Sequence, residues 1–158
     1  MALPAQDEEL SYDESVVGVE VETGRFEVTK EHILSFCEAI GDTNPLFTDE
    51  EAARTGPYGG LIAPPAFYTS IRTGGGLDPK LRYGNLTLNA GQHWEYHAPI
   101  RPGDTITART KVHDIYEKTG RTGRMVFLVR RTTYTNQRGE VVAVSDASLV
   151  HRKVEQQQ

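Results

Sequence analysis

The second half of the sequence is a series of strand-like segments joined only by turns and short connections, and this limits the chain to folds built on a long antiparallel sheet. Apolar and polar residues alternate along most of each segment, which is typical of strands. Gly91 interrupts the first segment and predicts a bulge there. The apolar run Met125–Val129 predicts a central strand that is buried on both faces. The expected strands cover about Leu86–Tyr96, Thr105–Glu117, Met125–Asn136 and Glu140–Val150.

The first half begins with one more strand and then becomes helical. A strand is predicted over roughly Glu20–Val28, ahead of a helix over Lys30–Ile40. Thr29 is a suitable N-cap for this helix, and Gly41 ends it. The apolar residues between them recur at helical spacing, which gives the helix one face for a core.

Two further helices are expected before the strand series. Thr48 begins a Thr-x-x-Glu capping box, so a short helix should follow and stop at Gly56–Pro57. Pro64–Pro65 suits the first turn of a third helix, from Ala66 to about Arg72, and a run of three glycines ends it.

Separate helical and strand blocks predict an α+β domain with its helices on one face of the sheet. The hot-dog fold, a long curved antiparallel sheet wrapped around a central helix, satisfies this order, with Ala66–Arg72 as the central helix. One domain is expected over residues 16–152. A flexible acidic arm is expected over residues 1–15 and a flexible tail over residues 153–158.

Composition excludes several classes of function. The net charge of −5 and the scattered basic residues argue against nucleic-acid binding. No stretch approaches the roughly 18 apolar residues of a membrane helix, and the N-terminus does not resemble a secretory signal. The single cysteine, Cys37, precludes an internal disulfide and suits the cytoplasm. No metal framework is visible, and no cofactor is expected.

The segment Gly41–Asp49 carries the most unusual group of polar residues. Asp42 could serve as a base or an orienting group, and Asn44 could exchange hydrogen bonds with a ligand. The simpler interpretation is local, because Asp and Asn commonly cap and turn the chain, and Asn44–Pro45 is a turn dipeptide.

This segment resembles the motif Asp-x-Asn-Pro-x-His-x-Asp of the MaoC-like dehydratases, also called (R)-specific enoyl-CoA hydratases or hydratase 2. The segment Gln92–Asp104 resembles the strand and the Pro-x-x-Gly-Asp turn of the same family. The two motifs occur in the family's order, and the resemblance covers about residues 20–150. The form of Leu61–Phe67 is most similar to the FAS1-like, N-terminal-type subgroup.

In that family an Asp and a His activate the water that adds to an enoyl thioester, an Asn assists, and a backbone N–H at the central helix polarises the thioester carbonyl. The resemblance carries the catalytic roles onto Asp42 and Asn44. The motif His is replaced by Phe47, which cannot transfer a proton. The family's His-Gly step is replaced by Ala63–Pro64, and proline has no N–H to donate, whereas Ala66 still has one.

His93, Glu95 and His97 share one face of a strand, and three interpretations stay open for them. They could hold a metal, a histidine could replace the missing base, or the histidines could belong to a sheet or subunit interface, which is the simplest interpretation. One basic group could meet CoA phosphates, although a solvated face is the default explanation: Lys118, Arg121, Arg124, Arg130 and Arg131.

The sequence therefore predicts a hydratase or dehydratase component that acts on an acyl-CoA or a related thioester. FAS1-like domains often form one half of a two-hot-dog unit, so this chain is expected to be the acyl-binding half of a heteromer. Self-sufficient catalysis in a homodimer, acyl-CoA binding without catalysis, and thioesterase activity are the alternatives. The expected substrate-binding residues are Phe47, Ala63, Pro64, Ala66 and His93.

Overall fold

A computed structural model describes residues 9–155. Its centre is one antiparallel sheet with the strand order β1-β3-β4-β5-β2. The strands are β1 (Val21–Glu27), β2 (Leu86–Tyr96), β3 (Thr105–Gly120), β4 (Gly123–Thr135) and β5 (Val141–Arg152). The predicted α+β class and the long antiparallel sheet are confirmed. As predicted, β4 lies in the middle of the sheet, and the register shift between Asn89 and Gly91 marks the expected bulge.

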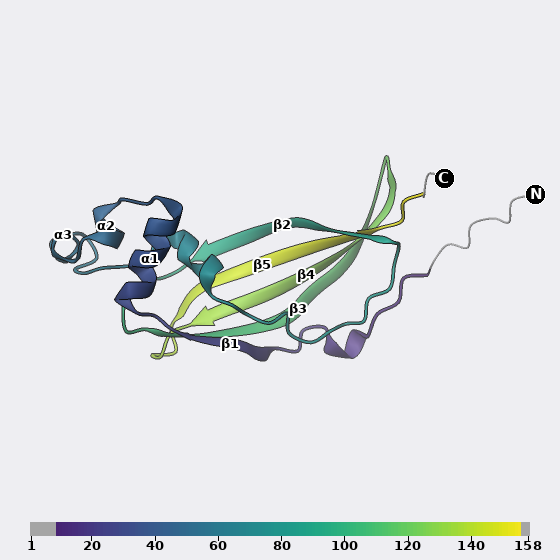
Figure 1. The fold of residues 1–158 in the computed structure, drawn as a ribbon. Helices are drawn as coiled ribbons and strands as arrows, with labels where there is room; N and C mark the ends of the chain where they lie inside the picture. The colour runs from purple at the N-terminus through teal and green to yellow at the C-terminus, as the bar shows by residue number, and fades with distance from the viewer. Residues whose placement is uncertain (1–8, 156–158) are drawn as a thin grey trace, which may run out of the picture.

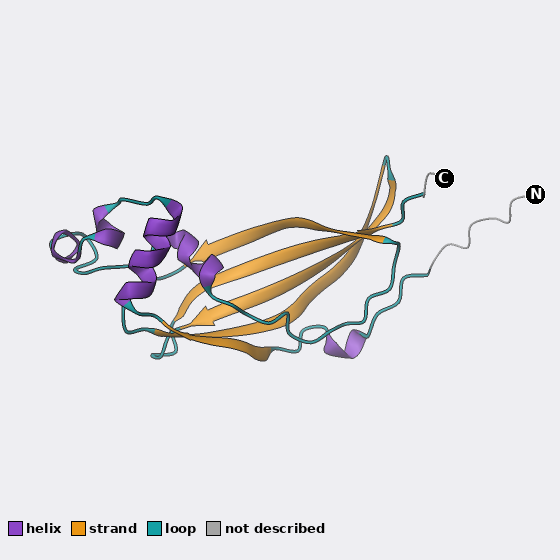
Figure 2. Cartoon of the chain, viewed as in Figure 1, coloured by secondary structure: helices purple, strands orange, loops and turns teal. Residues whose placement is uncertain are grey.

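The helices gather at one end of this elongated sheet, whereas the strands continue well beyond them (Figure 1). This group consists of α1 (Lys30–Ile40), α2 (Pro45–Thr48), α3 (Glu50–Arg54) and the 3-10 helix η2 (Pro65–Ser70). A second 3-10 helix, η1 (Glu14–Val16), lies apart from them, beyond β1. Figure 2 shows the loop after η2 running along the sheet toward its far end.

The helix α1 has the predicted boundaries, and its first turn is fixed by a reciprocal cap. The Thr29 hydroxyl accepts a hydrogen bond from the His32 N–H (3.1 Å), and the His32 ring accepts one from the Thr29 N–H (3.3 Å). Gly41 adopts the left-handed conformation that ends the helix.

Two helix predictions need correction. The cap of α3 is Asp49 rather than Thr48, because the Asp49 carboxylate accepts the first free N–H groups of α3, whereas the Thr48 hydroxyl donates to the Asn44 carbonyl. The turn of α2 was not predicted at all. It begins at Pro45, so the predicted loop is one helical turn.

The expected central α-helix over Ala66–Arg72 is instead the short 3-10 helix η2. Its two proline-bearing N-terminal positions supply no N–H donors, and the hydroxyls of Thr69 and Ser70 donate back to backbone carbonyls within the same turns. Phe67 of η2 is nevertheless fully buried, and its ring packs edge-on against Phe36 of α1 at 5.6 Å. The segment therefore keeps the position of a core element between α1 and the sheet.

The loop after η2 is held against the sheet by contacts to its backbone. Arg130 of β4 donates to the carbonyls of Gly75 and Leu77. Gly84, at φ 68°, lies where a Cβ would come within 2.2 Å of the Arg152 carbonyl oxygen.

The two predicted terminal segments are only partly described. Ser11 and Arg82 form a β-bridge, and the Asp13 N–H donates to the Pro79 carbonyl, so this part of the expected arm lies against the domain. The backbone of Val154 exchanges two hydrogen bonds with Asn85. Residues 1–8 and 156–158 lie outside the described part. Within the described residues, no helix is long and apolar enough to cross a membrane.

Candidate functional site

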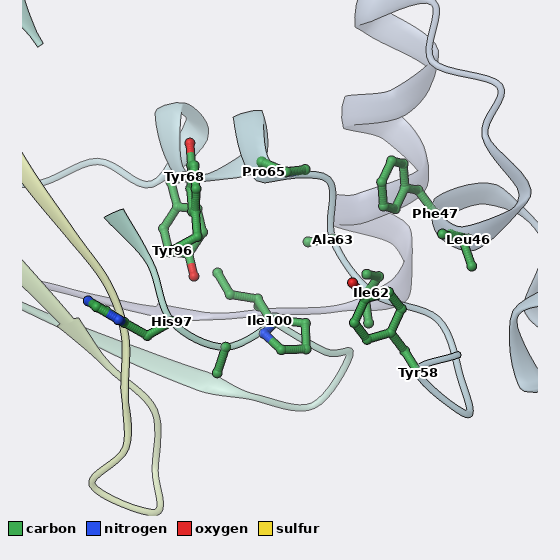
Figure 3. A pocket seen from close by; sticks show the side chains of 12 residues that line it. Leu46, Phe47, Tyr58, Ile62, Ala63, Pro65, Tyr68, Tyr96, His97 and Ile100 are labelled. Carbon is green, nitrogen blue, oxygen red and sulfur yellow. The ribbon is translucent and has the colours of Figure 1, made fainter. Parts of the chain in front are cut away.

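A cavity of about 330 Å³ lies where the helical end of the chain meets the end of β2. Two backbone hydrogen bonds join its walls: the Ala63 N–H donates to the Ile100 carbonyl (2.8 Å), and the Ile62 N–H donates to the Leu46 carbonyl (3.3 Å). Figure 3 shows Leu46, Phe47 and Tyr58 toward one end of the cavity and Tyr68 and Tyr96 at the other. The full lining is Leu46, Phe47, Tyr58, Ile62, Ala63, Pro65, Tyr68, Tyr96, His97, Ala98, Pro99 and Ile100.

The second motif shapes this cavity through its turn. Asp104 is buried, and its carboxylate accepts hydrogen bonds from the Arg101 N–H (2.9 Å) and the Gln137 side chain (2.9 Å). These bonds fix the Pro102–Asp104 turn and thereby hold Ile100, two residues before the turn, in the cavity wall. The acidic residue of this turn is therefore explained by structure alone.

An aromatic cluster closes one end of the cavity. The Tyr68 ring lies 5.6, 5.5 and 5.3 Å from the rings of Trp94, Tyr96 and Tyr134, respectively. Burial raises the pKa of Tyr68 far above its ordinary value, and burial also raises the pKa of Tyr134. These phenols are neutral at physiological pH, so they can donate hydrogen bonds but cannot act as bases.

Some of the predicted substrate-binding residues line the cavity and others do not. Phe47 and Ala63 are in its wall. Pro64 is buried at the N-cap of η2 and does not line the cavity, and Ala66 is exposed in the first turn of that helix. His93 lies elsewhere, in a second hollow of about 500 Å³ that also contains His113 and Asp146.

The two predicted catalytic residues perform local capping and do not line the cavity. The Asp42 carboxylate accepts the Asn44 N–H (3.0 Å), and the Asn44 side chain accepts the Leu46 N–H (3.0 Å) as the N-cap of α2. Asn44 is exposed and Asp42 is half-buried. This geometry supports the local interpretation of both residues, and through α2 they position Leu46 and Phe47. Their catalytic role stays a prediction.

His97 is the one imidazole of the cavity lining, but it lies at the rim. In Figure 3 its ring points away from the apolar walls. Its Nε2 atom lies 3.8 Å from Glu95, whose other oxygen lies 3.5 Å from His93. No group of three side chains in residues 9–155 is arranged to hold a metal ion.

The predicted basic group does not form one anion-binding patch. Arg124 pairs with Glu117, Arg131 pairs with Asp146, and Arg130 donates to backbone carbonyls of the loop after η2. Three of its arginines are thus already engaged within the chain.

Tyr58 and Ile100 are cavity residues that sequence reasoning missed, and Tyr68 was not singled out either. Tyr58 lies in a Gly- and Pro-rich turn, where an aromatic side chain has no periodic pattern to mark it. The only available signal was the concentration of aromatic residues in segments that flank the two motifs.

Comparison with known proteins agrees with this architecture. The family model for the FAS1-like dehydratase domain region matches residues 15–145. The chain is 38% identical over 132 residues to the UPF0336 protein Franean1_6066 of Parafrankia sp. strain EAN1pec, which covers 80% of this chain and 85% of that protein.

The chain belongs to the FAS1-like dehydratase family. This FAS1-like dehydratase chain is similar to the MaoC-like dehydratase from Rhodospirillum rubrum, with a TM-score of 0.67, 28% identity, and coverage of 89% of this chain and 94% of that one. It is also similar to a chain of the HadBC (3R-hydroxyacyl-ACP dehydratase) complex from Mycobacterium tuberculosis, with a TM-score of 0.64, 25% identity, and coverage of 85% and 96%. The hot-dog fold and the hydratase/dehydratase family are thereby confirmed.

Proposed function

We propose that this chain binds the acyl part of an enoyl or 3-hydroxyacyl thioester and forms the acyl-binding half of a heteromeric hydratase or dehydratase. The observation that carries the proposal is the apolar cavity with Phe47 in its wall, at the position of the family's catalytic His. An apolar side chain there suits contact with an acyl group rather than proton transfer. The proposed reaction requires no cofactor, and the thioester is its substrate.

The chemistry of the lining supports a division of labour between two chains. The lining contains no carboxylate, its histidine is turned to the rim, and its buried tyrosine is neutral. Addition of water to an enoyl thioester needs a group that takes a proton from water and one that returns a proton to carbon. A second MaoC-like hot-dog chain with an intact Asp-x-Asn-Pro-x-His motif would supply both.

The edge strand β2 supports association with such a chain. Among residues 9–155 it pairs only with β5, and almost all of its residues are exposed, including Leu88 and Tyr96. An open edge strand of this length can pair with another chain. HadBC, which is similar in structure, is a dehydratase complex.

The test compares binding and turnover. The purified chain should bind crotonyl-CoA in calorimetry yet leave its enoyl absorbance unchanged. Hydration should appear when a co-purified hot-dog partner with the intact motif is added. Full hydration by the pure chain would contradict the proposal and would favour self-sufficient catalysis. Binding without turnover under any partner condition would instead make the chain a non-catalytic acyl-binding module.

A further inference from the structure

One residue of the cavity lining carries a buried hydroxyl that has no hydrogen-bond partner. Among residues 9–155, three buried side-chain polar atoms lack one, namely Tyr68 Oη, His151 Nε2 and Arg152 Nε. Of these residues, only Tyr68 lines the cavity. A buried polar group without a partner costs about 1–3 kcal/mol, so native structures rarely keep one without a reason.

The surroundings of Tyr68 fix the position of this hydroxyl. The side chain is 4% exposed, and its ring is held among Trp94, Tyr96 and Tyr134. The neighbouring hydroxyl of Tyr134, by contrast, interacts with the side chains of Ser145 and Thr73, which lower its pKa against the effect of burial. Of these two buried phenols, only Tyr68 lines the cavity, and its hydroxyl is the one without a partner.

The chemistry of the cavity defines the partner that this donor would take. The lining has no Lys, Arg, Asp or Glu, so a fully charged group would be desolvated there without compensation. An uncharged oxygen acceptor on an apolar ligand fits both the walls and the donor. Because burial raises the pKa of Tyr68, the phenol keeps its proton at physiological pH.

The local sequence also removes two of the competing backbone donors, although the Ala66 N–H remains. Pro64 and Pro65 open η2 and have no N–H groups. A thioester carbonyl near this helix therefore lacks two backbone donors that other residues would provide, and the Tyr68 hydroxyl lies in the next turn of the same helix.

We propose that the Tyr68 hydroxyl donates a hydrogen bond to the carbonyl oxygen of the bound acyl thioester, and thereby fixes the thioester at the aromatic end of the cavity. This inference rests on the proposed acyl-binding function. Tyr68 would be the polar contact that distinguishes an acyl thioester from an alkyl thioether of the same length.

The experiment uses the Tyr68→Phe variant and two ligands that differ only at the carbonyl, butyryl-CoA and S-butyl-CoA. Calorimetry should show that the variant binds butyryl-CoA about fivefold more weakly than the wild type, as loss of one neutral hydrogen bond predicts. Its affinity for S-butyl-CoA should be unchanged. Tyr134→Phe is the matched control, and it should not alter the ratio of the two affinities.

Thermal unfolding separates this role from a structural one. Without ligand, Tyr68→Phe should unfold at the same temperature as the wild type or higher, because an unsatisfied group is removed, whereas Tyr134→Phe should unfold at a lower temperature. Unchanged butyryl-CoA affinity, or an equal loss for both ligands, would overturn the role of Tyr68 and leave acyl binding intact. Failure of the wild type to bind either compound would instead overturn acyl binding itself.

Discussion

Phe47 occupies the position of the motif His and places an apolar ring in the cavity wall. It follows Asn44 by three residues, as the family's catalytic His does, and it packs against the buried core as well as lining the cavity. An aromatic ring there adds apolar contact area and removes the capacity for proton transfer.

Replacement of Phe47 by Asn should weaken binding of the acyl group without changing the binding of the CoA part of the ligand. Loss of the apolar contact, worth about 1.5 kcal/mol, should lower the affinity for butyryl-CoA roughly tenfold. The affinity for free CoA should stay at the wild-type value. Calorimetric titration with both ligands measures the difference, and an equal loss for butyryl-CoA and free CoA would place Phe47 outside the acyl site.

Among the elements, β4 and β5 are joined by a polar contact as well as by their backbone ladder. Arg131 donates two hydrogen bonds of 2.7 Å each to the Asp146 carboxylate. These bonds hold the pKa of Asp146 below its ordinary value, although burial acts in the opposite direction, and the nearby His113 and His93 also lower it. Because the two side chains are 33% and 20% exposed, the pair is only partly screened by solvent.

The contribution of this pair should depend on pH. Asp146→Asn should lower the free energy of unfolding by about 1–2 kcal/mol at pH 7. Because the pKa of Asp146 is lower in the folded state than in the unfolded state, the ion pair stabilises the folded protein fully above the ordinary Asp pKa of about 3.9. This stabilisation is lost as the pH falls through the pKa that Asp146 has in the folded state. The difference between variant and wild type in urea unfolding should therefore narrow from pH 7 to pH 3.

An exposed pair serves as the control for this prediction. Glu22→Gln breaks the contact between Glu22 and Arg25, which are 47% and 65% exposed, and it should change stability by less than about 0.5 kcal/mol. A pH-independent effect of Asp146→Asn would show that packing, rather than the ion pair, causes the loss.

At the scale of the whole molecule, the sheet is open at β2. The helices α1–α3 and η2 lie at one end of the sheet, and β2 forms one of its edges (Figure 1). The residues of β2 are exposed along nearly the whole strand. A second hot-dog chain added at this edge would complete the backbone pairing of β2 and cover Leu88, which is 45% exposed.

Charge placed on this edge should therefore prevent association. Leu88→Glu should weaken the complex at least tenfold in sedimentation velocity measurements, because a desolvated carboxylate replaces an apolar contact. Ile40→Glu is the control, since Ile40 is 51% exposed but lies on α1, far along the chain from this edge. Equal effects of the two substitutions would exclude β2 as the interface.

The sequence by itself determined the features that depend on neighbouring residues. Alternation of apolar residues, the Thr29 cap and Gly41 set the strands and α1 within a few positions, because caps and side-chain periodicity act over one or two turns. The two motifs likewise led to the dehydratase family. The capping role of Asp42 and Asn44 was also a local effect, and it was the simpler of the two interpretations.

Only the tertiary structure decided which side chains share the cavity. Tyr58, Tyr68 and the stretch Tyr96–Ile100 are three separate segments of the chain, and contacts between such segments follow from sheet register and packing, which no local pattern encodes. The same holds for His93, which the sheet turns toward Asp146 rather than the cavity. Its side-chain direction follows from the register between β2 and β5, which pairs His93 with Asp146.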